Sequence, residues 1–360
     1  MIVETVILRQ MAKMLEFRIK FITPLLIHGA ESREVDTIGL TGKALRGCWR
    51  FWFRAIVGGL LDGSVEVQDL LIKLLNLESR IFGSASERQE TIGARFRMVI
   101  EPPADLELKI EDIHPGFQRR FNFTGFEFND NDWFKVKILP RSIMTDNKEQ
   151  EVLLAIIWLW ANLGAVGQRA RRGFGSPVIS GVNNADGLFE SIGLSGTPNF
   201  NDNNSLKQHL QTGVKKVAKQ ISGWLKKNGE HPNSDIENNP APTEASFFIL
   251  KSIRQIAVSE ETFDQNAIIS VVHGSKGCDS LGWVESGNRM ASPVFTRLHK
   301  VGNNFASVIT FCKQRVNKRG NSIVIPDDSC LRAYLQGGNC KHEVNFPGLG
   351  ITQNLKGEPI

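Results

Sequence analysis

The periodicity of apolar residues in the first half of the chain constrains the fold more than any other sequence feature. From Leu15 to Phe21, apolar and charged side chains alternate, which is the pattern of a strand with one buried face. Patterns of this kind predict strands at 15–21, 95–100, 134–138 and 177–179. Apolar residues at helical spacing predict helices at 42–57, 67–77 and 148–163. Thr41 is the expected N-cap of the first helix, and Gly58 and Gly59 are expected to end it.

In chain order these elements are strand, helix, strand, strand, helix, strand. This is the order of a ferredoxin-like, split βαβ domain, which we expect over residues 14–180 with helical and loop insertions. A stretch at 181–204 that is rich in Gly, Asn, Ser and Asp predicts a linker. A second ferredoxin-like (RRM-like) domain is expected over 205–347, followed by a C-terminal tail at 348–360. The expected fold class is therefore α+β, with two domains in tandem.

The second half gives a weaker pattern. A helix from Ser205 is predicted to bury one apolar face and to carry lysines on the other. Those lysines are Lys215, Lys216, Lys219, Lys226 and Lys227. Strands are predicted at 247–253, 267–272, 294–298 and 306–312.

Length and composition agree with two packed domains. Of the 360 residues, 41% are hydrophobic and 22% are charged, which is ample apolar material for a core. The net charge of +5 permits a nucleic-acid partner without requiring one. Five cysteines without close pairing fit a reducing cytoplasm. The longest apolar run, at 152–161, is shorter than the ~20 residues that a membrane span needs, so it predicts a buried helix.

The first predicted helix carries a stripe of arginines. Arg46, Arg50 and Arg54 recur at every fourth residue, so they share one side of the helix, and Lys43 lies just before them. A planar guanidinium group donates two parallel hydrogen bonds to phosphate oxygens, so the stripe predicts contact with a polyanion. A basic face that is neutralised by nearby carboxylates is the alternative interpretation.

A second basic cluster follows the predicted helix at 148–163. Residues 164–176 read GAVGQRARRGFGS and contain no acid. Glycines permit a backbone to approach a polyanion closely, and the arginines supply charge. The candidate binding residues here are Gly164, Gly167, Arg169, Arg171, Arg172, Gly173 and Gly175. A simple turn that joins the helix to the next strand is the alternative interpretation.

Other chemistries find less support in the sequence. The glycine-rich loop follows a helix and lacks a Gly-Lys-Ser/Thr ending, so we expect no nucleotide cofactor. Cys330, Cys340 and His342 lack the close spacing of zinc ligands, so we expect no metal. His28, after the first strand, is a weak candidate for a general acid or base, and Asp36 is similarly placed.

Taken together, these residues resemble the RAMP superfamily of CRISPR RNA-binding proteins. The resemblance is carried by TPLL at 23–26, LRG at 45–47, WRFWFRA at 49–55, ESRIFG at 78–83 and the glycine-rich loop. Within the superfamily, the first helix and RMASP at 289–293 look most like the family of first-numbered RAMP subunits of type III-B (Cmr) complexes. This resemblance implies two ferredoxin-like domains, no nuclease activity, and contact with RNA and neighbouring RAMP subunits near the 3′ end of the guide RNA.

The leading hypothesis is a non-catalytic subunit that holds guide or target single-stranded RNA by its phosphates. Lys43 and the two arginine clusters are expected to converge on one cleft that grips the RNA. One alternative is a metal-independent endoribonuclease that processes CRISPR repeat RNA with His28 as acid or base. Another is a structural adaptor whose basic stripe faces an acidic partner subunit.

Overall fold

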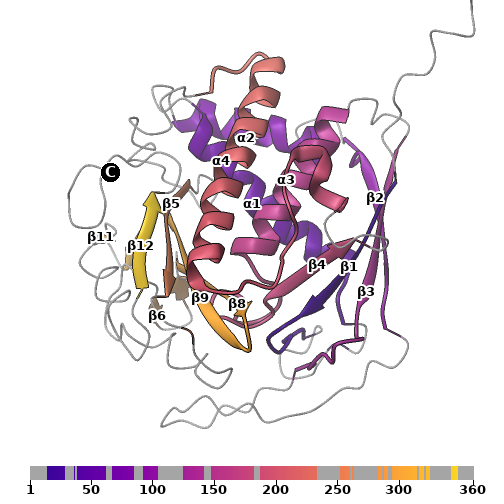
Figure 1. The fold of residues 1–360 in the computed structure, drawn as a ribbon. Helices are drawn as coiled ribbons and strands as arrows, with labels where there is room; N and C mark the ends of the chain where they lie inside the picture. Colours follow the sequence, from indigo (N-terminus) through magenta and orange to yellow (C-terminus); the bar gives the residue numbers. More distant parts are fainter. Residues whose placement is uncertain are drawn as a thin grey trace, which may run out of the picture.

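The computed structural model describes most of the first 232 residues and parts of the remainder. The described residues are 14–28, 36, 39–61, 67–84, 92–103, 125–141, 147–181, 187–232, 252–259, 262, 283–285, 288–290, 294–313, 316–319, 322–324 and 342–347. In this part of the chain, two four-stranded antiparallel sheets flank a central group of helices (Figure 1). One continuous hydrophobic core contains side chains from both sheets and from the helices.

The first sheet has the strand order β2-β3-β1-β4, with every neighbouring pair antiparallel. Its strands are β1 (Leu15–Phe21), β2 (Phe96–Glu101), β3 (Phe134–Pro140) and β4 (Pro177–Gly181). The helices between them are α1 (Gly42–Leu60), α2 (Val67–Phe82) and α3 (Asn147–Leu163). This order of strands and crossovers is that of a split βαβ unit. The predicted α+β class is confirmed.

The second sheet has the order β12-β5-β9-β8 and is also antiparallel. Its strands are β5 (Ser252–Ser259), β8 (Val294–Val301), β9 (Asn304–Lys313) and β12 (His342–Pro347). If the four strands of each sheet are numbered 1 to 4 in chain order, both sheets have the same spatial order, 4-1-3-2. The segments in which a second βαβ unit would have its helices lie largely outside the described residues, as does the predicted strand at 267–272. A tandem pair of ferredoxin-like domains therefore stays a prediction.

Four short strands form two further two-stranded sheets. These are β6 (Trp283–Glu285) with β7 (Asn288–Met290), and β10 (Val316–Arg319) with β11 (Ser322–Val324). The residues predicted to form the C-terminal tail, 348–360, lie outside the described part.

The segment predicted as a linker is packed against the core where the structure describes it. It contains a 3-10 helix, η1 (Gly187–Ile192), and the buried side chains of Phe189, Leu194 and Phe200. The next helix, α4 (Asn203–Lys227), has Asp202 as its N-cap and packs against α3, where a Cβ atom at Gly213 would meet the ring of Trp158. The apolar side chains of residues 187–204 therefore pack against the core.

Two helices extend beyond their predicted ends. Helix α1 continues through Gly58 and Gly59 to Leu60, and α2 continues past Leu77 to Phe82, where Gly83 has a φ of 74°. Core packing overrides the local stop signals, because Leu60, Ile81 and Phe82 are buried. The longer α2 places residue 78 on a helix beside α1.

Helix α3 is buried from Val152 to Leu163, as predicted for the apolar run. Among the described helices, none has the length and apolar character that a bilayer crossing requires.

Candidate nucleic-acid interface

Helix α1 presents its arginines on a firmly anchored scaffold. The Thr41 hydroxyl accepts a hydrogen bond from the Ala44 amide at 3.2 Å, which confirms the predicted N-cap. The core-facing side chains of α1 are buried as predicted; they are Leu45, Trp49, Trp52, Phe53 and Ile56. The stripe of Arg46, Arg50 and Arg54 is half-buried on another side of the helix, and Lys43 is exposed.

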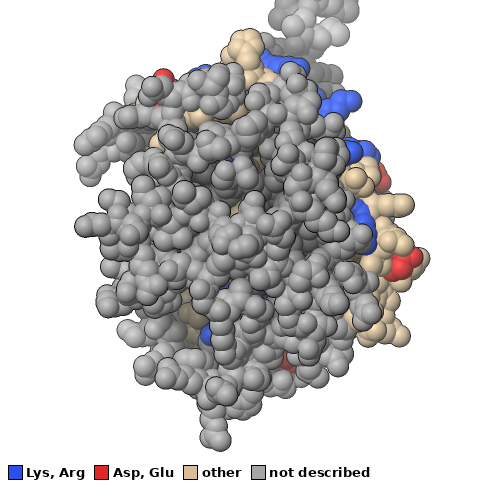
Figure 2. Space-filling view, turned by 90° about the vertical axis from the view of Figure 1, so that its left-hand side faces the viewer, with Lys and Arg blue, Asp and Glu red and all other residues tan. Residues whose placement is uncertain are grey.

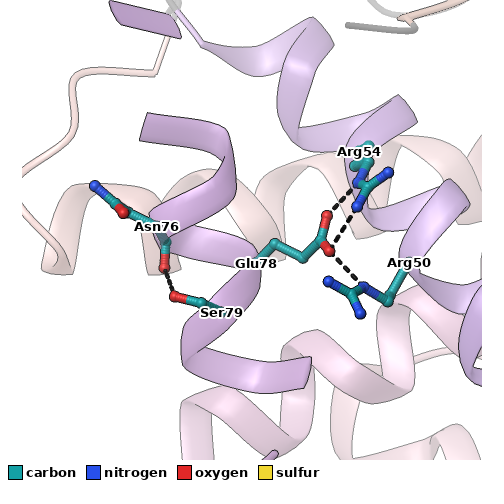
Figure 3. A network of polar contacts seen from close by, with 5 residues as sticks. All are labelled: Arg50, Arg54, Asn76, Glu78 and Ser79. Atoms are coloured by element: carbon teal, nitrogen blue, oxygen red, sulfur yellow. Dashed lines mark hydrogen bonds and ion pairs between the residues drawn. The ribbon is translucent and has the colours of Figure 1, made fainter. Parts of the chain in front are cut away.

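Two of these arginines share a buried carboxylate that the sequence analysis did not identify (Figure 3). Arg50 Nε donates to Glu78 Oε1 at 2.5 Å, and Arg54 donates to Glu78 through Nε and through Nη2, the latter at 2.8 Å. The Glu78 side chain is 1% exposed, whereas Arg50 and Arg54 remain 35% and 28% exposed. The stripe is therefore partly neutralised, as the alternative interpretation held. Because two guanidinium groups share one carboxylate, the cluster keeps a net positive charge.

Arg46 has different surroundings. Its guanidinium carbon lies 5.6 Å from the centre of the Phe96 ring, and its Nε is buried without a hydrogen-bond partner among the described residues. Burial lowers the pKa of Arg46, and the positive charges of Arg50 and Arg141 lower that pKa further. A cation whose charged neighbours are also cations is well suited to receive an anion. Arg141, at the end of β3, is a second residue that sequence reasoning missed.

The glycine-rich loop is held against the segment that follows β1. The Ser176 amide donates to Thr23 Oγ1 at 2.9 Å, and the Gly175 amide donates to the Pro24 carbonyl at 2.9 Å. The Gln168 amide donates to the Leu26 carbonyl at 2.6 Å. The TPLL motif and the loop are thus two halves of one local structure.

Most glycines of this loop pack closely against other parts of the protein. Gly164, Gly173 and Gly175 are buried against protein atoms, and their role as contacts for a polyanion stays a prediction. A Cβ atom at Gly164 would meet the Trp52 ring nitrogen, and one at Gly175, where φ is 63°, would meet the Val166 carbonyl. Gly167 is exposed, but a Cβ atom there would lie 2.6 Å from the Leu26 carbonyl oxygen. The accessible part of the loop is 167–172.

The three arginines of the loop differ in their surroundings. The Arg171 guanidinium lies over the rings of Phe295 at 4.5 Å and Phe51 at 5.8 Å, and burial lowers its pKa. Arg169 has a φ of 55°, and burial together with the charge of Arg172 lowers its pKa to about 10. Arg172 is exposed. Arg171 therefore ties the loop to α1 and β8, while Arg169 and Arg172 lie on the accessible stretch of the loop.

The glycine-rich loop contacts the helix that carries the arginine stripe. Arg171 reaches the helix at Phe51, and Phe51 is a surface neighbour of Arg54 because residues three apart lie side by side on a helix. Closer to the helix start, Cys48 Sγ lies 3.6 Å from the Ala165 carbonyl oxygen. Two regions more than a hundred positions apart in the sequence therefore meet at α1, and convergence of the two arginine clusters on one cleft stays a prediction.

The candidates for catalysis and metal binding gain little from the structure. His28 is half-buried, burial lowers its pKa, and its Nδ1 has no hydrogen-bond partner among the described residues. The backbone amide of Asp36 donates to the Ile27 carbonyl. Within the described ranges, no three His, Cys, Asp or Glu side chains lie close enough together to hold a metal ion. Cys330 and Cys340 lie outside those ranges.

A separate basic face lies on α4. Its exposed lysines are the five predicted from the sequence, Lys215, Lys216, Lys219, Lys226 and Lys227, and the helix contains no Asp or Glu. Among the residues coloured in Figure 2, Lys and Arg side chains gather along the upper right edge. Lys216 is engaged locally, since its Nζ donates to the Gly193 carbonyl at 2.6 Å.

Comparison with known proteins finds a family model that matches part of the first half of the chain. Residues 18–178 match the model of the RAMP superfamily. The chain is 30% identical over 215 residues to CRISPR system Cmr subunit Cmr1-1 of Pyrococcus furiosus, an alignment that covers 58% of each protein. It is 26% identical over 180 residues to Cmr1-2 of the same organism, covering 44% of this chain and 91% of that one.

Two solved structures share the fold. The crystal structure of apo Cmr1 from Pyrococcus furiosus superposes with a TM-score of 0.55 at 18% identity, covering 93% of this chain and 100% of that chain. A chain of the type III-B Cmr-beta complex bound to cognate target RNA gives a TM-score of 0.52 at 11% identity, covering 90% and 98%.

Proposed function

We propose that the chain belongs to the RAMP superfamily, whose model matches residues 18–178, and that it is an RNA-binding subunit of a type III-B CRISPR effector complex. Its partners would be guide or target RNA and neighbouring RAMP subunits, with contact near the 3′ end of the guide RNA. Similarity to the Cmr subunits of Pyrococcus furiosus and to a chain of an RNA-bound Cmr-beta complex supports this assignment.

The observation that carries the proposal is the contact between the glycine-rich loop and α1, the helix that carries the arginine stripe. Arg46, Arg50 and Arg54 occupy one side of the helix, and the loop approaches an adjacent side through Arg171. Lys43 and Arg172 are exposed, and Arg169 is half-buried. Among the described residues, Glu78 is the carboxylate that pairs with the stripe, and it is shared by two arginines. The net charge of this surface is therefore positive, as phosphate binding requires.

The chemistry of the surface favours the RNA backbone over its bases. Guanidinium groups bind phosphate oxygens without reference to sequence. Sequence would then be read by base pairing between guide and target, by analogy with other RNA-guided effectors. Unrelated single-stranded RNAs are expected to bind with similar affinity.

The experiment that tests the proposal compares two double variants by fluorescence anisotropy with labelled oligouridylate and with one unrelated RNA. Arg46→Gln with Arg172→Gln removes two charges from the proposed surface, and no described carboxylate pairs with either side chain. Lys226→Gln with Lys227→Gln removes two charges from α4 and is the matched control.

We expect each arginine substitution that removes a phosphate interaction to weaken binding of both RNAs roughly tenfold, because hydrogen bonds to charged groups contribute about 1.5–3 kcal/mol. The lysine variant should bind as the unmodified chain does. Equally weakened binding in the two variants, or unchanged binding by the arginine variant, would contradict the proposed site.

The proposal includes binding without cleavage, and one assay separates it from the endoribonuclease alternative. A CRISPR-repeat RNA incubated with the chain in EDTA should stay intact. Cleavage that disappears in the His28→Ala variant would favour the alternative, in which His28 acts as general acid or base.

A further inference from the structure

We infer that Glu78 is a positioning residue for RNA binding, which holds the side chains of Arg50 and Arg54 in the orientation that receives a phosphate. This inference rests on the proposed function and adds a residue that carries the opposite charge to the site. It also gives a role to the ESRIFG motif at 78–83, whose first residue reaches α1 from α2.

The hydrogen bonds leave most of each guanidinium group available. Each arginine has five N–H donors. Arg50 donates to Glu78 through Nε alone, and Arg54 donates through Nε and one N–H of Nη2. Both terminal nitrogens of Arg50 and the Nη1 of Arg54 have no hydrogen-bond partner among the described residues. Both side chains remain about a third exposed, at 35% and 28%, so a ligand can reach each of them.

Burial makes Glu78 a fixed support. Its side chain is 1% exposed, so its carboxylate needs the hydrogen bonds that the arginines supply. In Figure 3 both guanidinium groups turn from α1 toward this one carboxylate on α2. Long arginine side chains lose rotamer freedom when they bind, and orienting them beforehand removes part of that cost at the moment of binding.

Electrostatics alone predicts the reverse effect. A carboxylate beside a phosphate-binding surface repels the phosphate, so removing its charge should strengthen binding. If Glu78 positions the arginines, removing its charge should weaken binding although the protein becomes more positive. The sign of the change in affinity therefore separates the two accounts.

The test compares Glu78→Gln with Glu101→Gln in the full-length chain, with labelled oligouridylate as the probe. Glu101 pairs with Lys137 at 2.7 Å on the first sheet, so its substitution adds the same charge without touching α1. We expect Glu78→Gln to bind the RNA roughly tenfold more weakly than the unmodified chain, because this is about the loss of affinity that results when one hydrogen bond to a charged group is removed. Its affinity should also fall less steeply with salt, while Glu101→Gln binds at least as tightly as the unmodified chain. If Glu78→Gln binds as tightly as Glu101→Gln, the inference is overturned.

Two further variants separate positioning from folding. Glu78→Asp keeps the charge but shortens the side chain, so it should weaken RNA binding with no change in net charge. Unchanged RNA binding by Glu78→Asp would overturn the inference even if Glu78→Gln failed to fold. Affinities are compared below the melting temperature of each variant, because a purely structural role would lower that temperature and leave binding by the folded protein unchanged.

The triple variant Arg50→Gln, Arg54→Gln, Glu78→Gln removes the whole cluster and leaves no buried carboxylate unpaired. If the folded triple variant bound RNA as tightly as the unmodified chain, the arginine stripe of the proposed function would be wrong. If it bound weakly while Glu78→Gln bound tightly, the proposed function would stand and the positioning role would fall.

Discussion

At the scale of single residues, one buried polar cluster contains an arginine and two histidines, and their described hydrogen bonds are to carbonyls and side-chain amide or hydroxyl groups. The Asn162 side chain lies 3.1 Å from His209 Nε2, and the Asn162 carbonyl accepts a hydrogen bond from His299 Nε2 at 2.8 Å. Arg297 is 1% exposed and donates to the carbonyls of Leu298 and Pro177. Burial and the nearby Arg297 charge lower the pKa values of both histidines, that of His209 to about 4. Both imidazoles are therefore neutral in the folded protein at neutral pH.

This cluster predicts a loss of stability in mild acid. In the unfolded chain His209 binds a proton below its ordinary pKa of about 6.5, whereas in the folded chain it does so only below about 4. The unfolded state thus binds more protons in this window, so the free energy of unfolding should fall as the pH drops from about 6.5 to about 4. The expected loss from His209 alone is on the order of 3 kcal/mol.

Urea denaturation at pH 7 and at pH 4.5 measures this loss, and His209→Gln is the control. The variant should show a smaller difference between the two pH values than the unmodified chain. An equal difference in both proteins would count against the assignment to His209.

At the scale of elements, a glycine of α1 and a glycine of the loop differ in whether their surroundings leave room for a side chain. Gly47 lies on the exposed side of α1, and a Cβ atom there would meet nothing within 4 Å. Gly175 has a φ of 63°, and a Cβ atom there would meet the Val166 backbone. The helix therefore tolerates a side chain at Gly47, whereas the loop does not tolerate one at Gly175.

The matched variants Gly47→Ala and Gly175→Ala test this difference by thermal denaturation. Gly47→Ala should stabilise the protein by roughly 0.5–1 kcal/mol, since alanine is the better helix former. Gly175→Ala should destabilise it by about 2 kcal/mol or more, because left-handed strain adds to a steric clash. Two variants with similar melting temperatures would be inconsistent with this account of the loop.

Sequence periodicity predicted the elements better than their roles in the site. The strand at Leu15–Phe21 and the Thr41 N-cap were predictable because they depend on local alternation and capping. The pairing of Glu78 with α1 was not, because α2 was expected to end at Leu77 and its extension depends on burial of Ile81 and Phe82. The close packing of the loop glycines was not predictable for the same reason, since Trp52 and Val166 become their neighbours only in the folded chain.

At the scale of the whole molecule, the loop joins the two sheets. The Gly173 amide donates to the Thr296 carbonyl, and the Thr296 amide donates to the Arg171 carbonyl, each at 3.0 Å. The Leu298 amide donates to Ser176 Oγ at 3.2 Å. Periodicity in the sequence indicated two domains, but it carried no information about these contacts between β8 and the loop.

We therefore predict cooperative unfolding of both sheets. Urea unfolding followed by tryptophan fluorescence and by far-UV circular dichroism should give coincident transitions, because one continuous core contains side chains from both sheets. Separate midpoints for the two signals would indicate two independently stable domains.

The most direct test of the central claim is the salt dependence of RNA binding by the full-length chain. Each phosphate contact on single-stranded RNA contributes about 0.7 to the slope of log affinity against log salt concentration. The Arg46→Gln, Arg172→Gln variant should therefore lower the magnitude of this slope by about 1.4, and the Lys226→Gln, Lys227→Gln variant should leave it unchanged. An unchanged slope in the arginine variant, or the same decrease in both variants, would contradict a phosphate-binding surface on α1 and its loop.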